Sequence, residues 1–145
     1  EKDAGTYYQK MLDNAATYHH MKILTMSRLT QNLLKAIDYE QTRQKRNENY
    51  RLLKELLPSD SPFTRVTPDG PFAYPYYHKN GIALRKALAK EKIFVPTNWS
   101  NVIRDCAPES YEYQWAADIL PLPCDQRYGN KEMQRIADVI HALEP

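Results

Sequence analysis

The side chains that could do chemistry are few and scattered in this sequence. The four histidines lie at positions 19, 20, 78 and 141, and no serine or cysteine stands with them in an activating context. Adjacent residues on a helix point about 100° apart, so His19 and His20 do not form a metal-binding pair, which needs i, i+4 spacing. We interpret Glu109 and Glu112 as carboxylates that keep a loop soluble, and not as an acid–base pair. We therefore expect that this chain alone has no catalytic residue and is inactive.

The remaining chemical signatures exclude further classes of protein. Cys106 and Cys124 form no C-x-x-C pair, which indicates two free thiols in a reducing compartment and favours a cytoplasmic location. Glycine-rich phosphate loops, H-E-x-x-H and G-x-S-x-G are absent from the sequence. No apolar run reaches the roughly 18 residues of a membrane span and no signal peptide is evident, so we expect no membrane partner.

Charge and aromatic content restrict the partners further. The net charge is +2, and the basic run from Arg43 to Arg46 lacks interleaved aromatics, so we expect a solvated helix face and no nucleic acid. Eleven tyrosines stand against three phenylalanines. Tyrosine combines an apolar ring with a polar tip, so these residues fit either a tyrosine-rich core boundary or a wet cleft or interface.

Hydrophobic periodicity and capping residues predict the elements that must position any site. Ser27 and Asp38 are expected to cap helices, and Asn130 is expected to cap the last one. The predicted helices cover 2–20, the residues after Ser27, 39–57, 82–90 and the residues after Asn130. The predicted strands are 64–66, 72–78 and 93–95, with an extended segment over 119–123 and an irregular loop over 97–115. Pro75 and the two prolines of 119–123 restrict those segments to the edge of a sheet.

This order predicts an α+β fold, in which helices cover a small and mostly antiparallel sheet. We divide the chain into an N-terminal helical segment, 1–26, and an α+β domain, 27–145. The sequence begins at Glu1 without a methionine, and we expect it to be a processed or truncated piece of a longer protein.

Several motifs together resemble one protein family. They are Ile93-Phe94-Val95-Pro96-Thr97-x-Trp99, then Ile119-Leu120-x-Leu122-Pro123-x-Asp125-Gln126-Arg127-Tyr128 and Met133, preceded by Arg46-x-x-Asn49-Tyr50-x-x-Leu53. Their order and spacing resemble the C-terminal small domain of DegT/StrS-type sugar aminotransferases, which are fold-type I enzymes that use pyridoxal phosphate (PLP). The resemblance covers roughly 21–143.

The resemblance implies a division of labour between two domains. The lysine, the aspartate and the stacking aromatic that hold PLP belong in that family to a large N-terminal domain, which this chain lacks, so we expect no cofactor here and PLP in the longer protein. In that family the small domain covers the substrate side of the cleft. A homodimer of the longer protein is compatible with the resemblance. Our candidate substrate-binding residues are Asn98, Trp99 and Tyr74. Asn98 stands where many members carry a histidine, which argues against an imidazole-dependent role.

A second interpretation is a stand-alone interaction or assembly module. Its docking face would consist of Tyr74, Tyr76 and Trp99. In either case the segment from Asp125 to Tyr128 is expected to be a structural turn, in which Asp125 accepts hydrogen bonds from amides and Arg127 pairs with a carboxylate.

Overall fold

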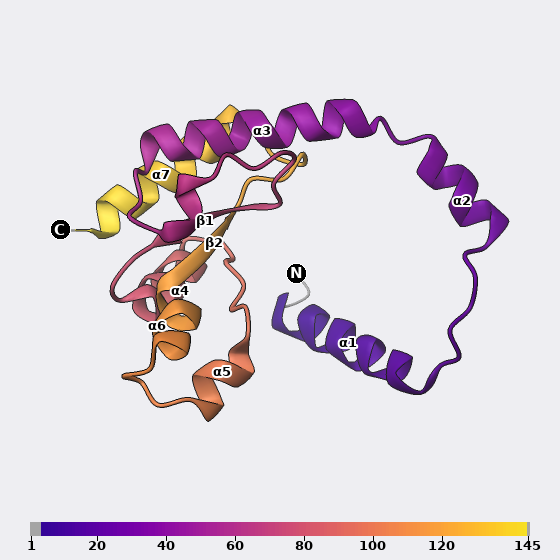
Figure 1. Ribbon diagram of the computed structural model, residues 1–145, viewed down its shortest axis with the longest axis horizontal. Coiled ribbons are helices and arrows are strands. Elements are labelled where there is room, and N and C mark those ends of the chain that lie inside the picture. Colours follow the sequence, from indigo (N-terminus) through magenta and orange to yellow (C-terminus); the bar gives the residue numbers. More distant parts are fainter. Residues whose placement is uncertain (1–3, 145) are drawn as a thin grey trace. The chain divides into compact units, whose positions relative to one another are not determined.

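A computed structural model describes residues 4–144 and divides the chain into two compact units, Glu1–Ile37 and Asp38–Pro145. The first unit contains α1 (Ala4–Thr17), a 3-10 turn (Tyr18–His20) and α2 (Arg28–Lys35), as labelled in Figure 1. Ser27 caps α2 as predicted, because its Oγ accepts a hydrogen bond of 3.1 Å from the amide of Thr30. Residues 2 and 3 of the helix predicted over 2–20 lie outside the described residues.

The second unit is the α+β fold that the sequence predicts. Helices α3 and α7 lie side by side, and α4 and α6 pack against β2 (Figure 1). The elements in chain order are α3 (Tyr39–Leu56), a 3-10 turn (Pro62–Arg65), β1 (Ala73–Tyr77), α4 (Gly81–Lys90), α5 (Ser100–Asp105), α6 (Tyr111–Asp118), β2 (Ile119–Pro123) and α7 (Asn130–Leu143).

The sheet consists of β1 and β2, which pair antiparallel although they lie far apart in the sequence. Tyr74 stands opposite Leu122 and Tyr76 opposite Leu120, and these four side chains are buried. The two strands also place Pro75 opposite Pro121. Because proline has no N–H, such a pair fits only where facing residues exchange no ladder hydrogen bonds. The prolines were expected to restrict these segments to the edge of a sheet, and in a two-stranded sheet both strands are edge strands.

The core of this unit lies where the sheet meets α3, α4 and α7. Its fully buried side chains include Leu53, Leu88, Leu120, Met133 and Ile140. The stripe predicted for the last helix is confirmed at Met133, Ile136, Ala137 and Ile140, whereas Leu143 is 38% exposed at the end of the helix. The helix begins after Gly129 and not after Asn130, because the carboxylate of Glu132 accepts the Gly129 amide at 2.8 Å and caps the first turn from within.

Three other local predictions are wrong, each for a physical reason. Residues 64–66 lie in and after a 3-10 turn, since Ser61 accepts the Phe63 amide and Pro62 fits the first helical position. Residues 93–95 alternate buried, exposed and buried as a strand would, but they pair with no strand among the described residues. The loop expected over 97–115 contains α5 and most of α6, which Ser110 caps through the Tyr113 amide at 3.2 Å.

Candidate functional site

Trp99, at the start of α5, is one of two described residues other than glycine with a positive φ, the second being Lys92. Trp99 adopts φ 52° and ψ 50°, the left-handed region, and its side chain is 70% exposed. That conformation costs a residue with a Cβ roughly 1–2 kcal/mol, and an exposed indole leaves apolar surface in water. Strained, exposed residues of this kind concentrate at functional sites, which makes Trp99 and the exposed Asn98 beside it the leading candidates.

The segment that leads to Trp99 is anchored at the end of α4. The amide of Ile93 donates to the carbonyl oxygen of Leu88 at 2.9 Å, and the amide of Lys92 donates to that of Ala89 at 3.1 Å. These two hydrogen bonds define a Schellman motif, with Lys92 in the left-handed position at φ 61°. Buried Ile93 and Leu88 supply the apolar contact that accompanies it. The motif therefore fixes the direction in which the chain leaves α4.

Phe94 follows this anchor and projects away from the core. It is 66% exposed, whereas its neighbours Ile93 and Val95 are buried. Phe94 lines a groove of about 220 Å³ whose other walls are Lys92, Ile93, Pro123, Tyr128, Glu132, Arg135 and Ile136. The sequence did not single out Phe94 as a site residue, although its position between two buried β-branched residues was a signal that it faces outward.

Tyr74 lies elsewhere, inside the core. Its side chain has no exposed surface, its hydroxyl donates to the carbonyl oxygen of Leu57 at 2.6 Å, and its ring meets that of Tyr50 edge to face at 5.2 Å. Burial raises the pKa of Tyr74 to about 12, so the hydroxyl stays protonated. A side chain without accessible surface does not contact a substrate in a cleft. The structure therefore separates Tyr74 from Asn98 and Trp99.

Tyr76 is also removed from the docking face of the second interpretation. It is 7% exposed, and its hydroxyl donates to the carboxylate of Glu144 at 2.6 Å. Burial and the hydrogen bond to this carboxylate both raise the pKa of Tyr76. Of the three aromatic residues expected on that face, only Trp99 is exposed, because β1 directs both tyrosines into the core.

The turn from Asp125 to Tyr128 is structural, as predicted. Asp125 is 2% exposed, and its carboxylate accepts the Arg127 amide at 3.1 Å and both Nε and NH2 of the Arg127 guanidinium, at 2.7 and 2.9 Å. The hydrogen bond from the Arg127 side chain lowers the pKa of Asp125 against the opposing effect of burial. The buried Asp125 carboxylate therefore holds the turn, and the Arg127 side chain that pairs with it stays exposed.

Helix α3 holds this turn, and it does so with residues that the sequence assigned to a solvated face. Arg46 Nε donates to Gln126 Oε1 at 2.8 Å, and the guanidinium of Arg43 contacts both Glu40 and Asp69. Lys45 pairs with Glu48 at 3.4 Å. The basic run is therefore paired with neighbouring side chains, and Arg46 anchors the turn after β2 through Gln126.

The thiols and a second groove complete the chemical inventory. Both cysteines are free as expected, and burial raises the pKa of the Cys124 thiol to about 12, which makes it a poor nucleophile.

A groove near the start of α4 contains Lys79, Lys86 and Asp118. Both lysines are exposed, and Asp118 accepts a hydrogen bond from the Gly81 amide at 3.2 Å. This arrangement does not fit PLP, which needs an enclosed lysine and a carboxylate free to face the pyridinium nitrogen.

Comparison with known proteins returns no significant match to a family model, to a curated protein or to a solved structure. Nowhere in the described part of the chain do three histidine, cysteine, aspartate or glutamate side chains gather in a group suited to a metal ion. Among the helices of residues 4–144, none combines the length and the apolar character needed to cross a bilayer.

Proposed function

We propose that the second unit is the C-terminal small domain of a DegT/StrS-like, PLP-dependent sugar aminotransferase, and that its Asn98–Trp99 loop faces the substrate side of the cleft. The observation that carries the proposal is the conformation of Trp99, a large aromatic side chain held exposed by a left-handed backbone. In the longer protein, the large domain would either pack against this exposed ring or hold a ligand that contacts it.

The contacts between the motifs support the resemblance. Asn49 and Arg46 belong to one of the resembling segments, and Gln126 and Tyr128 belong to another. Arg46 donates to Gln126, and Asn49 Nδ2 donates to the carbonyl oxygen of Tyr128 at 3.0 Å. The segments quoted for the resemblance thus support one another physically, as motifs of one folded domain would.

The distribution of large aromatic side chains supports a missing partner domain. All phenylalanines and tryptophans of the chain are at least half exposed, namely Phe63, Phe72, Phe94, Trp99 and Trp115. Such residues are usually buried in a domain of this size, and large exposed apolar surfaces mark interfaces. Phe63 and Trp115 already contact each other edge to face at 5.9 Å, so they form a paired aromatic surface and not two isolated side chains.

The location of the cofactor tests the proposal. The longer protein would be purified, treated with borohydride to reduce the bond between PLP and its lysine, and mapped by peptide mass spectrometry. We expect one labelled lysine outside the 145 residues of this chain, and no label when the isolated chain is treated in the same way. A label on a lysine of this chain, or a longer protein that binds no PLP, would reject the proposal.

Fewer exposed residues now support the interpretation of this chain as a stand-alone interaction module. It now depends on Phe94, Trp99 and the Phe63–Trp115 pair, because Tyr74 and Tyr76 are buried. A defined partner that binds these residues and is not a PLP-binding domain would favour it over the aminotransferase proposal.

A further inference from the structure

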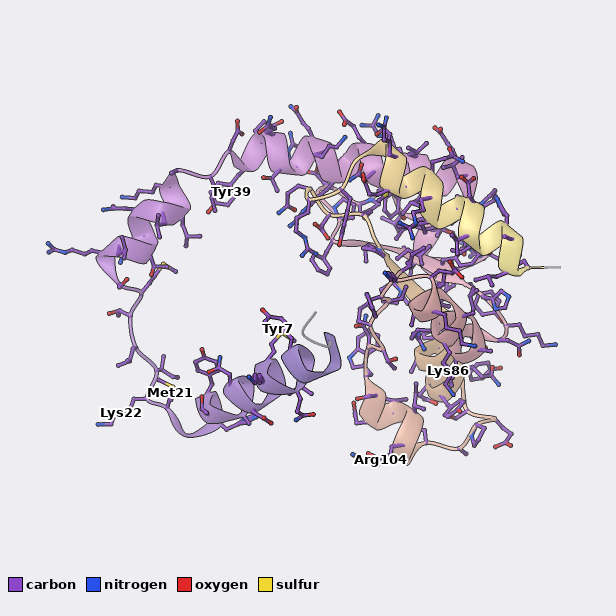
Figure 2. All side chains as sticks on the ribbon, turned by 180° about the vertical axis from the view of Figure 1, so that it is seen from behind. Tyr7, Met21, Lys22, Tyr39, Lys86 and Arg104 are labelled. Carbon is purple, nitrogen blue, oxygen red and sulfur yellow. The ribbon has the colours of Figure 1, made fainter. Side chains whose placement is uncertain are left out.

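The longest uncovered apolar stretch lies in the first unit, over residues 21–37, which we call the basic arm. Every residue in it is exposed. Figure 2 shows the side chains of Met21 and Lys22 extending from the segment between α1 and α2. Its large apolar side chains and their exposed fractions are Met21 54%, Ile23 103%, Leu24 74%, Met26 50%, Leu29 70%, Leu33 62%, Leu34 36% and Ile37 44%.

The apolar side chains of α2 lie along one side of the helix. Leu29 and Leu33 are spaced by four residues, the spacing that aligns side chains on a helix, and Leu34 widens this stripe. Ile37 follows just beyond the end of the helix. The helix is held by local bonds, because Ser27 caps it and Gln31 Nε2 donates to the Met26 carbonyl oxygen at 2.9 Å. Isolated helices shorter than about 12 residues are marginal in water. An eight-residue helix with no buried residue therefore requires a partner for stability.

The charge of the arm indicates what kind of partner it needs. No aspartate or glutamate occurs between Asp13 and Asp38, whereas Lys22, Arg28 and Lys35 carry three positive charges. The second unit has fifteen basic and fifteen acidic residues, so it offers no excess of negative charge to a second copy of the arm. Two arms would repel each other for the same reason. A second copy of this chain is thus a poor partner.

A lipid surface fits less well than a protein surface. Interfacial helices anchor with tryptophan, phenylalanine and leucine, and lipid-binding basic clusters contain roughly four to eight lysines and arginines. The arm has three cations, and all phenylalanines and tryptophans of the chain lie in the second unit. We infer that the basic arm docks, through its leucine stripe, into an apolar groove edged with carboxylates on a separate folded protein domain. This inference stands independently of the proposed function.

Two matched helical peptides test the inference on the full chain. Both carry a leucine stripe, and the stripe is flanked by glutamates in one peptide and by lysines in the other. Because the three cations of the arm would pair with glutamates in one peptide and meet lysines in the other, we expect roughly tenfold tighter binding of the glutamate peptide in a fluorescence anisotropy titration at low salt. The triple variant Lys22→Glu, Arg28→Glu, Lys35→Glu should reverse this preference.

Two further variants separate the stripe from the polar side of α2. Leu29→Ser with Leu33→Ser should abolish binding of the glutamate peptide, whereas Asn32→Ser on the polar side should leave it unchanged. The urea transition of the second unit serves as the folding control and should be the same in both variants. Equal binding of both peptides, tighter binding to phosphatidylcholine–phosphatidylserine vesicles, or self-association lost in the leucine variant would each overturn the inference.

Discussion

The side-chain amide of Asn49 lies 3.0 Å from the carbonyl oxygen of Tyr128, although 79 residues separate them in the sequence. The same Nδ2 also approaches the carbonyl oxygens of Cys124 and Asp125, at 3.3 and 3.1 Å. Asn49 is fully buried in α3, so one side chain holds the turn that links β2 to α7. We therefore expect the packing of α7 on α3 to depend on this contact.

Asn49→Ala should therefore destabilise the second unit. The substitution leaves buried carbonyl oxygens without a donor, and each unsatisfied buried group costs about 1–3 kcal/mol. We expect a loss of about 2–3 kcal/mol in the free energy of unfolding measured by urea denaturation. Asn101→Ala, at an exposed position of α5, is the control and should change little. Equal stability of the two variants would contradict the role of Asn49.

Gly81 should tolerate no side chain. A Cβ at this position would lie 2.3 Å from the carbonyl oxygen of Ala117 and 2.6 Å from the Cα of Asp118, and both are backbone atoms that cannot rotate away. Overpacking of this kind costs about 1–3 kcal/mol or more, so Gly81→Ala should lower the thermal midpoint clearly. At Gly129 the nearest atom is a flexible glutamate oxygen at 3.5 Å, and Gly129→Ala should have a much smaller effect.

Lys92→Gly should stabilise the protein. Lys92 occupies the left-handed position of the Schellman motif, where glycine avoids the clash of a Cβ. We expect a gain of about 1 kcal/mol in the free energy of unfolding, reduced in part by the greater freedom of glycine in the unfolded chain. Lys90→Gly, inside α4, should have the opposite sign. A destabilising effect of Lys92→Gly would mean that the lysine side chain itself contributes to the fold.

Acid should weaken the turn after β2 through Asp125. Its hydrogen bonds to Arg127 lower the pKa of this carboxyl from 3.8, so the folded state binds the proton less readily than the unfolded chain. The stabilisation is complete above 3.8 and is lost as the pH falls through the lower value of the folded state. Asp125→Asn should flatten this part of a profile of unfolding free energy against pH. An unchanged acid limb would contradict the assignment.

The sequence predicts those parts of the fold that local chemistry determines. Ser27 and Asp38 cap their helices, and Pro75 lies in an edge strand. Strand pairing is different because it depends on distant residues. Residues 93–95 alternate in burial without any partner strand, whereas 119–123 pair with β1 despite their prolines.

The candidate site was predictable only in part. Trp99 was named from its motif, and its exposure agrees with a residue that faces a cleft. Tyr74 was misplaced because alternation along a strand does not reveal which face is covered, and α3 covers the face that carries it. The groove beside Phe94 joins residues from two distant segments, 92–94 and 123–136, so no local pattern could predict it.

The most direct test of the proposed function is a spectral titration of the longer protein with an amino-sugar nucleotide, followed at the absorbance of bound PLP. The Trp99→Ala variant should need at least about tenfold more ligand for half of the change, which corresponds to roughly 1.4 kcal/mol of lost contact. Tyr111→Ala, which removes an aromatic ring that is 77% exposed on α6, should titrate like the unmodified protein. Identical curves for Trp99→Ala and the unmodified protein, or no change in absorbance at all, would contradict the account.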